Sequence, residues 1–139
     1  MRKMAICLAA LGLAGCAIFG GLGSPDPLAG WGGVWAGEYQ GGSGAGALEF
    51  EFSTDTAGTP VGLARFDTGM GMEQTRLESP VLTRDSLYAG LSFDGMAVEI
   101  RGARGEEDSA EGTFVLRYTG QQQPIDSGIW RARRRPSGQ

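Results

Sequence analysis

Short runs in which apolar and polar residues alternate recur along the chain from Trp31 onward. In the clearest run, 47–53 (ALEFEFS), Leu48, Phe50 and Phe52 share one face and the glutamates between them share the other. Successive side chains of a β-strand point to opposite faces, so this alternation indicates strands that bury one face. No stretch of ten residues in this part of the chain shows helical periodicity. The pattern therefore predicts an all-β fold.

The alternation predicts eight short strands separated by turn residues. Pro80 makes the fourth an edge strand or a bent one. In the third, the parity of Val61 and Leu63 disagrees with that of Phe66, which a β-bulge would reconcile. The expected strands lie at about 33–40, 47–53, 61–67, 74–82, 86–93, 96–102, 111–118 and 127–134.

A two-residue Asp94-Gly95 loop joins the fifth and sixth expected strands. Asp-Gly between alternating runs is a strong hairpin signal, because both turn positions need positive φ. The resulting register places six apolar side chains on one face: Leu87, Leu91, Phe93, Met96, Val98 and Ile100.

Eight strands joined by hairpin-length loops predict an antiparallel up-and-down meander over residues 31–135, followed by a disordered tail at 136–139. Such a sheet removes its exposed edges by curling into a closed or nearly closed small barrel. An eight-stranded barrel holds either packed side chains or one small ligand. The residues expected to line the interior or contact a ligand are Trp35, Tyr39, Phe50, Phe52, Phe93, Phe114 and Trp130.

Gly33-Val34-Trp35 in the first expected strand, together with an arginine in the last, resembles the pattern of calycins, which include lipocalins and avidin-like proteins. In that family the tryptophan of the G-x-W motif is covered by an arginine from the final strand. The resemblance implies that Arg131 or Arg133 closes the barrel in this way. It bears on the fold and names no ligand.

The N-terminal residues have the composition of a signal peptide. Arg2 and Lys3 precede an uncharged apolar stretch at 4–14. That stretch is too short to cross a bilayer as a helix, which needs about 20 residues, but it suits a signal-peptide core. Leu13-Ala14-Gly15-Cys16 then resembles the lipobox of bacterial lipoprotein precursors.

The lipobox resemblance implies cleavage before Cys16, leaving 1–15 as the signal peptide, and a lipid on the cysteine that holds the protein on a membrane. The alternatives are a plain secretory signal with a chance cysteine and a short transmembrane anchor. Residues 16–30 are rich in Gly and Pro and are expected to form the lipidated cysteine and a flexible tether. If the host is Gram-negative, Ala17 after the cysteine indicates the outer membrane, facing the periplasm, by resemblance to the sorting pattern of those bacteria.

The residue types exclude most routes to catalysis. The chain contains no His and no Asn, its only Lys is Lys3, and its two cysteines are Cys7 and Cys16. After the expected cleavage and lipidation it therefore has no Ser-His or Cys-His pair, no Schiff-base lysine, and no thiolate or imidazole for zinc or haem. We expect no enzyme, no metal and no cofactor, with a hydrolase that uses carboxylates alone as the remaining catalytic alternative.

Charge and several short motifs have ordinary explanations. Without Arg2 and Lys3 the chain has 10 basic and 16 acidic residues, 10 − 16 = −6, so nucleic acid is not an expected partner. Residues 42–47 fit G-x-G-x-x-A but open a strand rather than a helix, which indicates a hairpin loop. Acidic residues 106–108 are expected to be solvated surface, with calcium as the alternative.

Two further features leave alternatives open. The arginine-rich end at 131–135 either meets anionic lipid or an acidic partner, or protects the last strand from edge pairing. Met70 and Met72 either guard a barrel mouth or fold back over the open end of the core.

Two functions without catalysis remain for the anchored domain. The first is an envelope lipoprotein whose barrel binds a small apolar or amphipathic ligand. The alternative is a non-enzymatic structural or interaction lipoprotein that presents a sealed barrel to an envelope protein. The volume and lining of the barrel interior decide between them.

Overall fold

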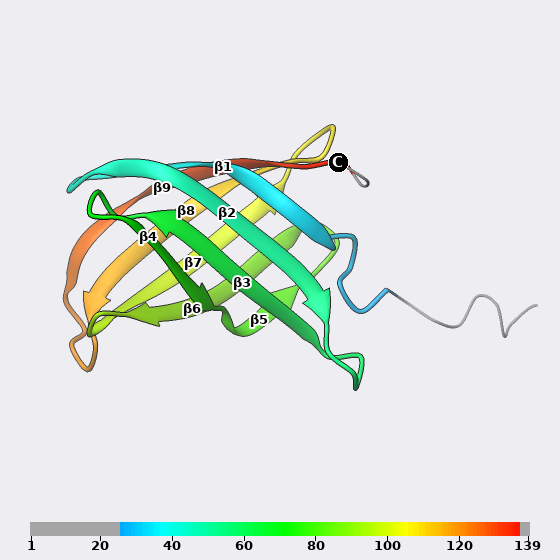
Figure 1. The fold of residues 1–139 in the computed structure, drawn as a ribbon, viewed down its shortest axis with the longest axis horizontal. Helices are drawn as coiled ribbons and strands as arrows, with labels where there is room; N and C mark the ends of the chain where they lie inside the picture. Colours follow the sequence, from blue (N-terminus) through cyan, green and yellow to red (C-terminus); the bar gives the residue numbers. More distant parts are fainter. Residues whose placement is uncertain (1–25, 137–139) are drawn as a thin grey trace, which may run out of the picture.

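The computed structural model describes residues 26–136, and these residues form one antiparallel sheet that curls into a barrel (Figure 1). The sheet order is β4-β3-β2-β1-β9-β8-β7-β6-β5. The strands are β1 (Gly33–Gly41), β2 (Ala45–Thr54), β3 (Pro60–Asp67), β4 (Met72–Arg76), β5 (Glu78–Leu82), β6 (Ser86–Phe93), β7 (Met96–Arg104), β8 (Ser109–Tyr118) and β9 (Pro124–Arg134).

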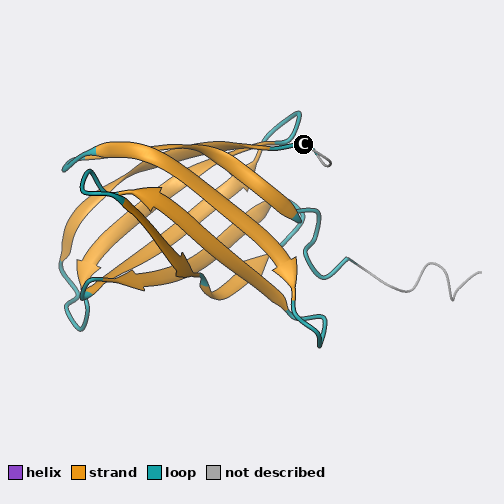
Figure 2. Ribbon diagram, viewed as in Figure 1, coloured by secondary structure: helices purple, strands orange, loops and turns teal. Residues whose placement is uncertain are grey.

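The all-β prediction is confirmed, and only strands, turns and loops are drawn in the described part (Figure 2). Nowhere in residues 26–136 is there a helix long and apolar enough to cross a bilayer. The signal peptide, Cys16 and the end of the expected C-terminal tail lie outside the described residues.

Nine strands appear where eight were expected, because the expected fourth strand is divided at Leu77. Its first arm, β4, pairs with β3, and its second arm, β5, pairs with β6. The Leu77 amide donates to the Gly62 carbonyl at 2.8 Å, and the Thr75 hydroxyl donates to the Ser92 carbonyl at 3.2 Å. The first bond extends the β3–β4 pairing to Leu77, where the chain passes from one edge strand to the other, and the second links β4 to β6, so the barrel is nearly closed.

The β6–β7 hairpin has the register that the alternation of the sequence predicts. Asp94 and Gly95 have φ of 47° and 76°, and Phe93 pairs with Met96 as predicted.

The third expected strand, β3, contains no bulge, since the β2–β3 register runs without a break. Gly62, Ala64 and Phe66 alternate as its buried positions, which leaves Val61 and Leu63 facing outward; the proposed bulge was wrong.

Glycines let neighbouring strands approach closely. A Cβ on Gly37 would lie 1.9 Å from the Arg131 carbonyl oxygen of β9, and a Cβ on Gly112 would lie 1.9 Å from the Arg101 carbonyl oxygen of β7. No side chain fits at either position. Such glycines permit the strong coiling that a small closed barrel needs.

Candidate ligand site

The two ends of the barrel differ. We call the end formed by loops 42–44, 68–71, 94–95 and 119–123 the open end, and the end formed by loops 55–59, 83–85 and 105–108 with the turn at 26–30 the closed end. Both termini of the described chain lie at the closed end (Figure 1). The open end therefore lies opposite the two ends of the described chain.

A cavity of about 370 Å³ occupies the barrel interior at the open end. Its walls are mainly aromatic and aliphatic side chains from strands all around the barrel. The lining residues are Tyr39, Ser43, Gly44, Ala45, Leu48, Phe50, Phe66, Thr68, Gly69, Leu91, Phe93, Met96, Val98, Ile100, Phe114, Leu116, Asp126 and Trp130.

Aromatic pairs shape the cavity. Phe50 and Trp130 are buried and meet edge to face with ring centroids 5.2 Å apart. Trp130 also donates from its indole nitrogen to the Arg101 carbonyl at 3.2 Å, which holds its ring in place. Nearer the loops, Phe66 and Phe93 make another edge-to-face pair at 4.9 Å. These contacts make the apolar wall a fixed surface rather than a set of loose side chains.

Asp126 is the charged residue of the cavity lining. Its carboxylate accepts hydrogen bonds from the backbone amides of Gly42 at 2.8 Å, Ser43 at 3.1 Å and Ser127 at 2.8 Å. Desolvation acts to raise the pKa of Asp126, but the hydrogen bonds from these amides outweigh it and the pKa is lowered. The side chain is therefore an anion at neutral pH and fixes the β1–β2 loop to the start of β9.

Tyr39 places a hydroxyl beside this carboxylate. The hydroxyl donates a short hydrogen bond to the Asp67 carbonyl. Burial raises the pKa of Tyr39, and the negative charges of Asp67 and Asp126 raise it further. Tyr39 is therefore neutral at neutral pH, and its hydroxyl lies in a negative electrostatic field.

The closed end is sealed by tryptophan and arginine. Trp31 and Trp35 are each 1% exposed, and their ring centroids lie 5.1 Å apart. The Arg134 guanidinium lies 4.7 Å from the Trp35 ring centroid and donates to the carbonyls of Gly30 at 2.7 Å and Gly32 at 3.0 Å. These contacts hold the 26–30 turn against the barrel floor.

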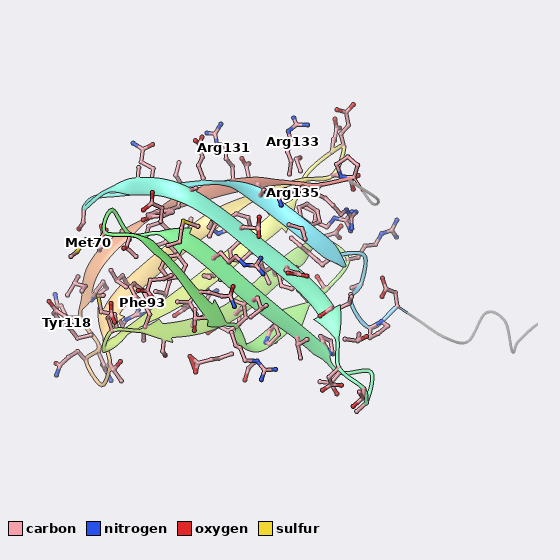
Figure 3. All side chains as sticks on the ribbon, viewed as in Figure 1. Met70, Phe93, Tyr118, Arg131, Arg133 and Arg135 are labelled. Carbon is pink, nitrogen blue, oxygen red and sulfur yellow. The ribbon has the colours of Figure 1, made fainter. Side chains whose placement is uncertain are left out.

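Arg134, rather than Arg131 or Arg133, therefore covers the G-x-W tryptophan. Arg131 and Arg133 are exposed and point away from the barrel (Figure 3). Parity explains the correction, since Arg134 is an even number of residues from inward-facing Trp130 whereas the other two are not. The alternation of β9 carried this information.

Five of the seven predicted interior aromatics line the cavity: Tyr39, Phe50, Phe93, Phe114 and Trp130. Trp35 and Phe52 belong instead to the closed end, where Trp31 packs edge-on to Phe52 at 6.1 Å and beside Trp35. Asp126 is a lining residue that the sequence did not single out. It lies outside the last strand expected from the sequence, but it is an even number of residues from Trp130 and so shares its inward parity.

Residues 26–30, expected to belong to the tether, form an ordered turn. The Asp26 carboxylate accepts hydrogen bonds from the amides of Leu28 at 3.0 Å and Gly30 at 2.9 Å. Leu28 and Ala29 pack against the buried core. Residues 26–30 are therefore packed against the barrel rather than part of a flexible tether.

The remaining motifs have structural settings. Residues 42–44 form the expected β1–β2 hairpin loop. In the acidic loop, Asp108 pairs with Arg134 at 2.6 Å, and among residues 26–136 no three acidic or sulfur side chains gather as a metal would require. Arg135 pairs with Glu49 at 2.9 Å. Met70 is 96% exposed and Met72 61% exposed, so neither folds back over the core.

Comparison of the chain with models of known protein families, with curated proteins and with solved structures finds no match.

Proposed function

We propose that the chain is a lipid-anchored protein of the bacterial envelope whose barrel binds a small apolar or amphipathic molecule, without catalysing a reaction. The observation that carries this proposal is the apolar cavity of about 370 Å³ at the open end. Ligand pockets typically occupy roughly 300–1,000 Å³ and combine apolar walls with a few placed polar groups. This volume favours a binding module over the alternative, a structural or interaction lipoprotein with a sealed barrel.

The direction of the barrel is compatible with an anchor at Cys16. Cys16 lies ten positions before Asp26, which is at the closed end. Extended chain reaches at most ~3.6 Å per residue, so the closed end would lie within about 36 Å of the lipid. The open end would then face away from the membrane, where a ligand in the surrounding space reaches it directly.

Binding is tested with a neutral apolar fluorophore, N-phenyl-1-naphthylamine, added to the purified protein. We expect saturable enhancement of its fluorescence. Val98→Trp places a large ring in the cavity and should weaken binding about tenfold or more, because it occupies the space that the probe needs. Val115→Trp is the matched control, since Val115 lies on the neighbouring strand β8 next to the inward-facing Phe114 and Leu116 and points to the outer face.

Absence of saturable binding by the unaltered protein would contradict the binding role. Equal weakening by both tryptophan variants would also count against it, because the loss would then come from general disturbance of the sheet. Thermal unfolding of both variants shows whether a loss of binding comes with a general loss of stability.

The anchor is tested by intact-mass analysis of protein extracted from membranes. We expect a chain that begins at Cys16 and carries the additional mass of acyl groups. Cys16→Ser should leave the precursor uncleaved and remove the acyl mass. A mature chain that begins elsewhere and carries no lipid would overturn this part of the proposal and leave the binding role standing.

A further inference from the structure

The cavity and its mouth have a one-sided charge distribution. Among the residues that line the cavity in the described structure there is no basic side chain, and the ionised group is the Asp126 carboxylate. The four loops of the open end contain no Arg or Lys. Arg117, which lies near this end, is held by Glu99 at 3.4 Å and by the Gln122 carbonyl at 3.1 Å.

Carboxylates also flank the mouth outside the cavity. Asp67, at the end of β3, accepts a hydrogen bond from the Gly69 amide at 2.8 Å, and Asp94 occupies the β6–β7 turn. Both Asp67 and Asp126 lie close enough to the Tyr39 hydroxyl to act on its ionisation. The polar end of the site therefore offers negative charge and hydrogen-bond acceptors, at the place where the head of an amphipathic ligand would sit.

The barrel interior has room for one short alkyl tail of a ligand. A volume of about 370 Å³ corresponds to roughly a dozen water-sized groups at about 30 Å³ each. Its walls contain Phe50, Phe114 and Trp130 and no cationic side chain that would neutralise a buried anion. A carboxylate or phosphate head placed at this mouth would be desolvated beside Asp126 without a compensating cation.

We propose that the barrel selects amphipathic ligands whose head group is cationic, such as a primary alkylamine, over anionic ligands such as a fatty acid, with the tail in the apolar cavity and the head beside Asp126. This inference rests on the proposed binding function and adds the chemical class of the ligand. Its basis is charge complementarity at a mouth that has a carboxylate and no cation.

The test compares three probes with the same ten-carbon tail: decylamine, decanol and decanoate. Their dissociation constants for the full-length protein are measured by calorimetry at pH 7 and low ionic strength, below the concentrations at which the probes form micelles. Exposed ion pairs contribute little, so we expect decylamine to bind about threefold to fivefold more tightly than decanol, and decanoate to bind more weakly than decanol by a similar factor. Added salt should narrow both differences.

Asp126→Asn removes the charge and keeps an amide oxygen that can accept from the β1–β2 loop. The ratio of the decanol to the decylamine dissociation constant should fall to about one in this variant. Asp94→Asn is the matched control: it removes a carboxylate at the same end of the barrel from a residue that does not line the cavity. Asparagine also tolerates the positive φ of this turn. This control should retain most of the preference.

Each outcome has a distinct meaning. If no probe binds, the proposed binding function fails. If decanoate binds as tightly as decylamine, the barrel is still a binding module but the inferred ligand class is wrong. If decylamine is preferred and Asp126→Asn leaves the preference unchanged, the assignment of the head-group site to Asp126 is overturned.

Discussion

The closed and open ends of this barrel are built from the same alternating strands but fill their interiors differently. At the closed end Trp31, Trp35 and Phe52 pack together, and Arg134 joins them to the 26–30 turn. At the open end Phe93 and Phe114 line a cavity instead of filling it. Packed volume stabilises a small barrel, and unfilled volume is what a ligand requires. The closed end therefore contributes most to stability, and the open end holds the proposed binding site.

The largest expected effect is that of removing a ring from the closed end. Trp35→Ala should lower the free energy of unfolding by ~3–5 kcal/mol, because it deletes a fully buried side chain from a packed cluster. Phe93→Ala at the open end should cost less than half as much, since that ring already borders open volume. Urea denaturation of the two variants measures the difference. Equal losses of unfolding free energy would show that the closed end is not packed more tightly than the open end.

A side chain added where two strands approach closely is expected to have the next largest effect. Gly37→Ala should destabilise the barrel by about 1–3 kcal/mol or more, because its Cβ would collide with the backbone of β9. Gly44→Ala, in the β1–β2 loop of the open end, is the control, because an added Cβ meets nothing within 4 Å. Thermal unfolding compares the two. A Gly37→Ala protein as stable as the Gly44→Ala protein would contradict the close strand approach.

Removal of the arginine seal tests the closed end through its polar contacts. Arg134→Met should cost about 1.5–3 kcal/mol, because it leaves the Gly32 carbonyl without its charged donor, leaves the Gly30 carbonyl with Arg104 alone, and removes the contact with Trp35. Arg133→Met, at the neighbouring exposed position, should change stability by less than about 0.5 kcal/mol. Similar losses from both substitutions, measured by urea denaturation, would reject Arg134 as the seal.

The smallest expected effect is a loss of stability at low pH, caused by protonation of two carboxylates at the closed end. Backbone amides of Leu28 and Gly30 lower the pKa of Asp26, and a hydrogen bond from Arg134 lowers the pKa of Asp108, each from an ordinary value of 3.8. A carboxyl whose pKa is lower in the folded state stabilises the fold above its unfolded value. That contribution is lost as pH falls through the folded value.

The urea concentration at the unfolding midpoint should therefore decrease as the pH is lowered below about 4, since both contributions begin to be lost near the ordinary carboxyl pKa. The Asp26→Asn, Asp108→Asn double variant should show a shallower fall than the unaltered protein. Asp126→Asn removes one lowered carboxyl at the open end and should flatten the curve less. Identical pH profiles for all three proteins would contradict this assignment.

The strands and their faces were predictable because they depend on local information. In β2, three apolar residues alternate with glutamates, and in the β6–β7 hairpin Asp94-Gly95 supplies the turn, so position and register follow from neighbours in the chain. The β3 strand was harder, since Val61 and Leu63 face outward although they are apolar. Only the pairing with β2 shows that Gly62, Ala64 and Phe66 form the inner face.

The candidate site was predictable in part. Most of the expected aromatics line the cavity because inward parity places them inside any barrel made from these strands. Their division into a packed end and a hollow end depends on where each lies along the barrel axis. That position is set by the strand pairings around the whole sheet, which no local pattern reveals.

By itself, therefore, the sequence determined the all-β class, most of the strands and the side chains that face inward. It also showed that the chain has no imidazole and only two thiols, at Cys7 and Cys16. The tertiary structure alone decided that Trp31 and the 26–30 turn close one end, and that Asp126 lies at the mouth of the other. The physical reason is the separation along the chain of the residues that interact. Alternation acts between adjacent residues, whereas the seal and the cavity arise from side chains up to about a hundred residues apart, brought together only when the sheet closes.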